Sequence, residues 1–285
     1  MTFGPFAYDF MRNAFAAATI VAIVSGLVGF FLVLRGQTFA GHALAHVGFT
    51  GATGAVLIGV APLWGLVLMT VVAGVVMGAL GEDFSGRDVA IGLVLTLALG
   101  LGLLFLHFFT AFATQATALL FGNVLAVDRP TLWALFGLGV ASVGGLAALA
   151  QRLLFASVHP ELAEAKGVNL RLLSVLFLAL VALATAACSQ VVGVLLVFTL
   201  MVGPAATAQR LTFRLGRGVA LAVALALAEA WGGLTFAFYT DWPTSFWITA
   251  LSGGAYGLAC LYAGRPGGRE WRPCKSLPPP VSTGV

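Results

Sequence analysis

Two histidines, His42 and His46, stand four residues apart in an apolar stretch of the chain. Residues at i and i+4 lie on one face of a helix, so both imidazoles can point the same way. Two nitrogen ligands at this spacing can reach one borderline metal ion such as Zn²⁺. The alternative is a pair of buried histidines whose ring nitrogens are satisfied by neighbouring hydroxyls and carbonyls. The paired spacing favours a metal path slightly over that alternative.

Three acidic residues and a third histidine are further candidates. Glu229 interrupts the apolar run 221–230, where it could complete a metal site, neutralise a moving cation, or stay protonated and donate a hydrogen bond. Asp241 is followed by Trp and Pro, a sequence that suits a turn or a helix N-cap, and it could also receive a cation. His107 and Asp128 fall near helix ends, where they could receive a cation or simply be solvated.

The composition indicates where these groups lie. The chain has 285 residues, of which 60% are hydrophobic and only 8% are charged, and its mean hydropathy is +1.05. A typical soluble domain has about 25% charged residues, so a soluble enzyme, a disordered chain and a secreted disulfide scaffold are all excluded. A net charge of +4 is too small to indicate nucleic acid as a partner. The sequence predicts a multi-pass membrane protein.

The fold class follows from the apolar runs. A helix needs about 20 apolar residues to cross a hydrocarbon core of about 30 Å. The division at Ser189–Gln190 rests on a short polar break, so eight spans is the alternative to nine. We therefore predict an all-α, polytopic transmembrane helical bundle with about nine spans: Asn13–Leu34, Thr38–Val60, Pro62–Leu80, Val89–Phe109, Thr131–Phe155, Arg171–Cys188, Val191–Ala208, Gly218–Thr240 and Pro243–Ala263.

Positive charges predict the orientation of this bundle. Cytoplasmic loops of membrane proteins are enriched in Lys and Arg. With nine spans and the N-terminus outside, all of the fourteen Lys and Arg residues except Arg12 and Arg129 fall on the inner side. The pattern predicts an N-out, C-in topology.

Three segments are not simple spans. Residues 157–168 read as a short polar helix that begins at Pro160 and stops at Gly167, a form suited to docking a soluble partner. Residues 110–130 are apolar but broken by Gln115, Asn123 and Asp128, and we expect them in the outer interface or dipping back into the protein. Residues 264–285 are rich in Pro, Gly and Arg and predict a disordered cytoplasmic tail.

Energy-coupling motifs are missing from the chain. Neither of its two lysines, Lys166 and Lys275, fits the phosphate-binding loop G-x-x-x-x-G-K-[ST]. The sequence also has no catalytic motif of the metalloprotease or serine-hydrolase type. We expect a protein that is not itself an enzyme, and any ATPase activity that drives it should belong to a separate subunit.

Four segments together resemble the permease subunits of zinc/manganese, or metal-chelate, ABC transporters. Residues 39–46 read Phe-Ala-Gly-His-Ala-Leu-Ala-His, similar to a family stretch that ends Gly-Asp-x-Leu-x-His. Residues 120–127 are similar to Leu-Phe-Gly-Asp/Ser-x-Leu-x-Val, and residues 159–168 to the cytoplasmic loop Asp-Pro-Glu-x-Ala-x-x-x-Gly-Val. The late stretches 194–208 and 232–244 follow in family order. Each segment is weak alone, whereas the ordered set is fairly specific.

This resemblance implies a fold, partners and site residues. It implies a permease domain over residues 1–263 in the cytoplasmic membrane of a prokaryote, with a coupling loop at about 156–170. The implied partners are a second copy of the chain, cytoplasmic ABC ATPase subunits and an extracytoplasmic metal-binding protein. Its family loop places Pro160, Glu161, Ala163 and Gly167 in the coupling helix.

The same resemblance implies a metal path but leaves the cargo open. It puts His46 on that path, while His42 departs from the family, which usually has Asp there. A carboxylate suits manganese and a second imidazole suits zinc. We expect no permanently bound cofactor and a transported Zn²⁺ ion, with Mn²⁺, Fe²⁺ or a metal chelate as the alternative cargo. Outside this family, a passive channel or a non-transporting scaffold would also fit the composition. Asn123 and Ser245 are smaller departures from the family and bear on the outer gate.

Overall fold

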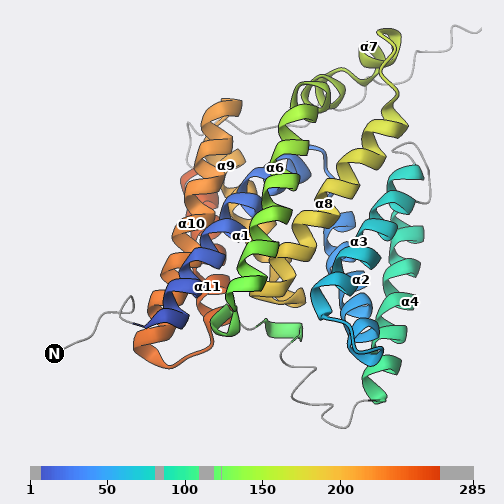
Figure 1. Cartoon of the computed structure of the whole chain (residues 1–285). Coiled ribbons are helices and arrows are strands. Elements are labelled where there is room, and N and C mark those ends of the chain that lie inside the picture. Colours follow the sequence, from blue (N-terminus) through green and yellow to red (C-terminus); the bar gives the residue numbers. More distant parts are fainter. Residues whose placement is uncertain (1–7, 81–86, 109–118, 123, 264–285) are drawn as a thin grey trace, which may run out of the picture.

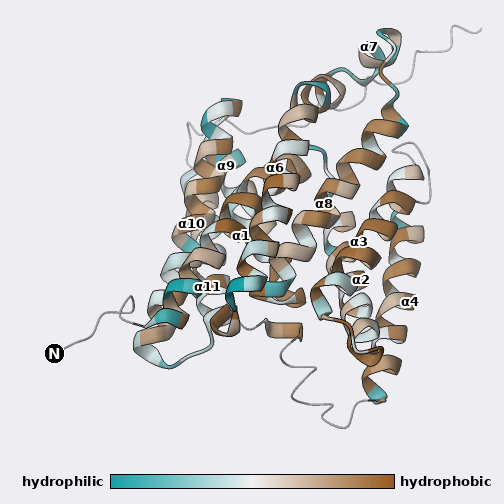
Figure 2. Cartoon of the chain, in the orientation of Figure 1, coloured by the Kyte–Doolittle hydropathy of each residue, from teal (hydrophilic) through white to brown (hydrophobic). Residues whose placement is uncertain are grey.

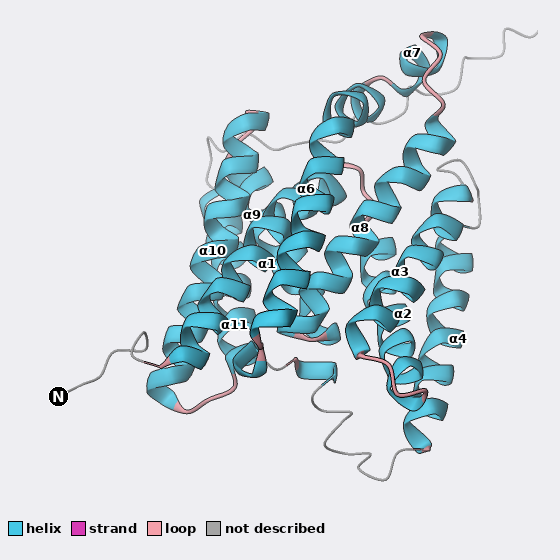
Figure 3. Ribbon diagram, viewed as in Figure 1, coloured by secondary structure: helices cyan, strands magenta, loops and turns pink. Residues whose placement is uncertain are grey.

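The computed structural model describes residues 8–80, 87–108, 119–122 and 124–263, and every regular element in these ranges is a helix (Figure 3). The predicted tail 264–285 lies outside the described residues, as do Gln115 and Asn123 of the broken outer segment. Two of the elements are short, the 3-10 helix η2 (Val124–Ala126) and α7 (Pro160–Ala165). The long helices are α1 (Asp9–Leu34), α2 (Thr38–Leu57), α3 (Pro62–Ala79), α4 (Arg87–His107), α6 (Arg129–Val158), α8 (Leu170–Val192), α9 (Val194–Leu211), α10 (Leu215–Thr240) and α11 (Thr244–Ala263).

These long helices confirm the predicted all-α, multi-pass fold. Seven of them, in the described part of the chain, are long and apolar enough to cross a membrane. The other two, α2 and α11, have at least the length of α3, but polar and small residues lower their hydropathy, including both histidines of α2. The number of spans, nine or eight, therefore stays a prediction.

The break between α8 and α9 lies at Gly193, and the predicted division at Ser189–Gln190 was misplaced. Both of those polar residues continue α8, and the carbonyl of Ser189 accepts the amide of Gly193 at 2.9 Å. Gly193 has φ +90°, a conformation that residues with a Cβ rarely adopt, so the helix stops there. A glycine without a polar flank ends the helix more effectively than the Ser-Gln pair.

Two groups of helices make up the bundle (Figure 1). In one group α2 packs against both α3 and α4, and α8 packs against α3. In the other group α1 packs against α9 and α10, and α11 covers those two. The long helix α6 lies across α1 and α8 and joins the groups. The contact between α2 and α9 also joins them. Residues on the α9-facing side of α2 therefore lie at the junction of the two groups.

Small residues allow the extensive contact between α3 and α8. A Cβ built on Gly74 would lie 2.7 Å from the carbonyl oxygen of Leu178, and one on Gly78 would lie 2.5 Å from the Cα of Val175. Membrane helices approach each other in this way because lipid gives them no hydrophobic driving force. Most of the bundle between its two ends is apolar (Figure 2). Each polar group inside it is thus a candidate for function.

One end of the bundle carries most of the positive charge. The C-terminal ends of α1, α6 and α9 and the N-terminal ends of α8 and α10 meet at the end from which α7 projects (Figure 1). Arg12 and Arg129 lie at the N-terminal ends of α1 and α6, at the opposite end. The predicted N-out, C-in topology would place the α7 end in the cytoplasm.

Candidate metal path and coupling surface

The two histidines of α2 face each other in the folded chain. Their ring centroids are 4.7 Å apart and the rings are almost perpendicular, at 83°. His46 is buried, with 8% of its surface exposed, whereas His42 is half-buried. The Nδ1 atom of His46 has no hydrogen-bond partner. A buried polar atom without a partner costs about 1–3 kcal/mol, so this nitrogen is suited to a ligand that arrives from outside the chain.

An aromatic ring from the other helix group closes one side of the pair. Phe198 of α9 packs against His42 with ring centroids 5.1 Å apart and an interplanar angle of 75°. This edge contact fixes the orientation of the His42 imidazole. The histidine pair therefore lies where α2 meets α9, between the two helix groups.

Thr50 continues the line of His42 and His46 one turn along α2. Its side chain is buried, and the hydroxyl donates a hydrogen bond to the carbonyl of Ala98 on α4. The i+4 spacing from His46 is a signal by which the sequence could have indicated Thr50. Phe198 has no such signal, because it reaches His42 from a helix distant in sequence.

Glu229 does not join the histidines. It is buried on α10, and its polar neighbour is Ser252 of α11. Within the described residues, no group of three or more His, Cys, Asp or Glu side chains is arranged to hold a metal ion. In this conformation the histidine pair and Glu229 are separate polar sites.

The remaining acidic and histidine candidates lie at helix ends. Asp241 is exposed and ends α10 with φ +56°, a left-handed conformation that Asp tolerates better than most residues. Asp128 caps α6, and hydrogen bonds from the side chain and the amide of Thr131 hold the pKa of its carboxyl below the ordinary value. His107 is exposed at the last turn of α4. None of these three contributes a ligand to the histidine pair.

The predicted polar helix is present as α7. It begins at Pro160, and Gly167, with φ +81°, follows its end, as the sequence predicts. Ala163 is fully buried and holds α7 against the bundle, while Glu161 and Leu162 are exposed. α7 therefore presents an acidic and apolar surface beyond the other helices (Figure 1).

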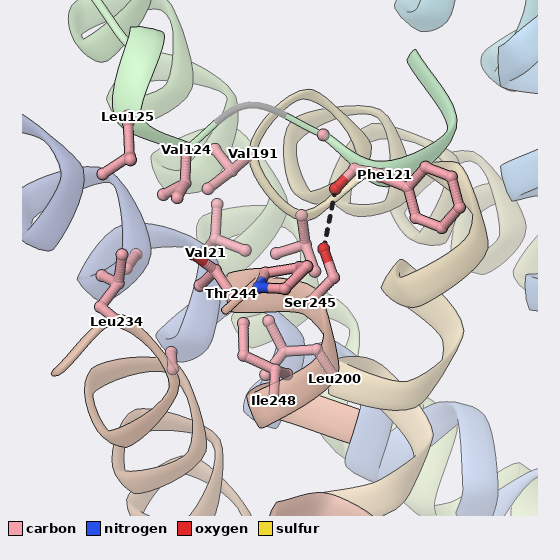
Figure 4. A pocket seen from close by; sticks show the side chains of 15 residues that line it. Val21, Phe121, Val124, Leu125, Val191, Leu200, Leu234, Thr244, Ser245 and Ile248 are labelled. Atoms are coloured by element: carbon pink, nitrogen blue, oxygen red, sulfur yellow. Dashed lines mark hydrogen bonds between the residues drawn. The ribbon is translucent and has the colours of Figure 1, made fainter. Parts of the chain in front are cut away.

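At the opposite end, the outer segment crosses the α8–α9 break. Gly122 and Gly193 are in backbone contact, and a Cβ on either glycine would overlap the main chain of the other. The Ser245 hydroxyl of α11 donates to the Phe121 carbonyl at 3.0 Å (Figure 4). Next to this crossing lies a cavity of about 180 Å³. Its mostly apolar walls come from the outer segment and from α1, α8, α9, α10 and α11.

Comparison with known proteins decides the family. A model of the ABC 3 transport family matches residues 7–263. The chain belongs to the ABC 3 transport family. Membership confirms the resemblance to zinc/manganese ABC permeases, and with the apolar helices it identifies a multi-pass protein of the cytoplasmic membrane of a prokaryote.

Relatives of this ABC 3 chain are named for metal transport. The manganese transport system membrane protein MntC of Halalkalibacterium halodurans is 30% identical over 268 residues, which cover 93% of this chain and 92% of that protein. A metal transport system membrane protein of Treponema pallidum is 32% identical over 82% of this chain and 88% of its own length. The solved structure of PsaBC from Streptococcus pneumoniae in complex with Fab is 25% identical, with a TM-score of 0.80 over 89% of this chain and 91% of that one. The chain is accordingly a transport permease of the ABC type, and the names of these three do not specify zinc.

Proposed function

We propose that this chain is the membrane-spanning subunit of an ABC importer that carries a divalent metal ion into the cytoplasm past His42 and His46. The observation that carries the proposal is the facing pair of imidazoles, with an unpartnered Nδ1 on His46, at the junction of two helix groups. Movement of one group against the other would expose such a junction first to one side of the membrane and then to the other. The ion would be held by the imidazoles in between.

Zinc is the cargo that the donor atoms favour. Imidazole suits borderline ions such as Zn²⁺, whereas carboxylates suit Mn²⁺, and both side chains of the pair are imidazoles. Manganese is the second candidate, because relatives about 30% identical are named as manganese transport proteins. Fe²⁺ belongs with manganese as an alternative cargo.

The proposed partners occupy the two ends of the bundle. A cytoplasmic ABC ATPase would bind α7, whose residues Glu161 and Leu162 are exposed while Ala163 anchors it. An extracytoplasmic metal-binding protein would deliver the ion to the end that holds Asp128 and Asp241. A second copy of the chain would complete the pathway. ATP hydrolysis by the ATPase would then move the two helix groups through its contact with α7, and the site would open to one side of the membrane and then to the other.

Metal uptake by cells tests the transport site. His46→Ala should reduce uptake of radioactive zinc to the level of cells that lack the permease, because it removes the unpartnered nitrogen. His107→Ala is the matched control, since that histidine is exposed at a helix end and should leave uptake unchanged. Full uptake by His46→Ala, at normal membrane levels of the protein, would remove the histidine pair from the pathway.

Co-purification separates an ABC permease from a passive channel. The intact chain should bring down a P-loop ATPase, and Glu161→Arg should lose it because the exposed acid of α7 is reversed. Arg214→Ala, another exposed change at the same end, should retain the ATPase. If the purified chain alone, without any ATPase, lets metal ions cross a membrane, it is a channel.

A further inference from the structure

A second buried polar site lies among α9, α10 and α11. Glu229 is 3% exposed and Ser252 is 1% exposed, and the two side chains interact across the α10–α11 contact. Both carboxylate oxygens and the Ser252 hydroxyl lack a well-formed hydrogen bond. Gly203 of α9 lies directly against Ser252, because a Cβ there would overlap the hydroxyl oxygen. The two carboxylate oxygens and the hydroxyl oxygen therefore share one enclosed place in the bundle.

A bare carboxylate in this place would be costly. Insertion scales assign about 2.5–3.5 kcal/mol to an ionised residue at the centre of a membrane helix, so a counter-charge or a proton is required. The helices packed against α10 are α1, α9 and α11. No described residue forms a salt bridge with Glu229, and its charge must be neutralised by something that enters the site. The titratable and charged groups on those helices and on α10 itself are Asp9 and Arg12 on α1, Arg210 on α9, Arg217 and Tyr239 on α10, and Tyr256, Cys260 and Tyr262 on α11.

Those groups are occupied or lie near helix ends. Asp9 and Arg12 pair with each other at 3.6 Å in the first turn of α1. Arg210 lies over the ring of Tyr256 and donates from Nε to its hydroxyl at 3.1 Å. Arg217 and Tyr239 lie in the first and last turns of α10, 12 and 10 residues from Glu229. No positive side chain is thus available to the carboxylate.

The outer cavity ends one helical turn from this site. Its walls include Leu200 of α9, Ala230 of α10 and Ile248 of α11 (Figure 4). Gly203 and Ser252 are three and four residues further along α9 and α11, and Glu229 is next to Ala230. Along each of the three helices, the residues that line the cavity lie nearer the outer end than the residue at the oxygen site.

The size of the oxygen site restricts its occupant. Ca²⁺ takes about 6–8 oxygen ligands and Mg²⁺ about six, whereas this site supplies three oxygens from two side chains and is closed by the backbone of α9. A proton needs one carboxylate oxygen, and the resulting hydroxyl needs one acceptor, which Ser252 provides. From these observations we propose that Glu229 and Ser252 form a proton-binding site, reached from the outer cavity and independent of the histidine pair.

The proposed step is a simple proton transfer. A proton from water at the outer end adds to the Glu229 carboxylate, which becomes a neutral carboxylic acid, and its O–H donates to the Ser252 hydroxyl oxygen. The neutral acid keeps α10 packed on α11. Loss of the proton would leave a charge that only water could solvate, so the two helices would separate.

Chemical labelling of the purified full-length chain in lipid nanodiscs tests this site. Dicyclohexylcarbodiimide is membrane-soluble and adds to protonated carboxyl groups in apolar surroundings as a stable N-acylurea. Mass spectrometry should find the adduct on Glu229 in acidic buffer, and the adduct should fall to background as the pH rises. Exposed acids such as Glu161 serve as internal controls and should not retain the label.

Two further measurements make the result decisive. Sodium, zinc or manganese at constant pH should leave the labelling of Glu229 unchanged, and so should His46→Ala. If metal uptake does not depend on His46, the proposed function is overturned, but the proton site is not. A missing adduct at every pH, or one blocked by a metal ion, would overturn the proton site.

Discussion

The histidine pair and the Glu229–Ser252 site are both buried polar groups in an apolar bundle, yet they differ in donor atoms and in surroundings. The histidines offer nitrogens at the junction of two helix groups, beside an aromatic ring from α9. Glu229 and Ser252 offer only oxygens inside a single group, closed by the backbone of α9. The contrast suggests that a junction between groups suits a cargo that must pass, while a closed site suits a small ion that stays within one group.

Removal of both imidazoles should have the largest effect. His42→Ala combined with His46→Ala should reduce zinc uptake to background, because no nitrogen ligand would remain. Glu229→Gln should keep most of the uptake at the same expression level, since the amide preserves the shape of the closed site. Equal losses in both variants would mean that the two sites act as one.

A large side chain at Gly203 should destabilise the closed site. Gly203→Leu would force α9 away from Ser252, and overpacking of this kind costs about 1–3 kcal/mol. The thermal unfolding midpoint in detergent should fall, while zinc affinity of the folded chain should not change. Gly253→Leu is the control, because nothing lies within 4 Å of a Cβ at that position. A loss of zinc affinity in Gly203→Leu would link the two sites directly.

A carboxylate in place of His42 should change the preference between metals. His42→Asp replaces one imidazole with a hard oxygen donor, so the ratio of zinc to manganese affinity should fall by about tenfold, or ~1.4 kcal/mol. Competition binding with both metals measures this ratio, with Asp88→Asn on α4 as a distant control. An unchanged ratio would exclude His42 as a ligand.

Loss of the aromatic contact should have the smallest effect. Phe198→Ala removes an edge contact worth about 1 kcal/mol and frees the His42 ring, so zinc should bind about fivefold more weakly. Phe136→Ala, an exposed aromatic on α6, should leave zinc affinity unchanged. Wild-type affinity in Phe198→Ala would show that α2 alone orients His42.

Local patterns in the sequence predicted much of this architecture. Apolar runs predicted the long helices, and Pro160 with Gly167 predicted α7, because these signals are local in the sequence. The break between α8 and α9 was predicted at Ser189–Gln190 but lies at Gly193, since its cause is a backbone conformation rather than a polar residue. The separation of Glu229 from the histidines and the contact of Phe198 with His42 depend on how distant helices pack. A single sequence carries no periodic signal for such contacts.

X-ray absorption at the zinc edge of the purified, zinc-loaded chain tests the central claim most directly, because it reports the atoms bound to the metal. The histidine-pair account predicts the multiple-scattering pattern of two imidazole ligands in the wild type and its loss in the variant that lacks both His42 and His46. A spectrum with oxygen ligands only, or one that the double substitution leaves unchanged, would contradict it.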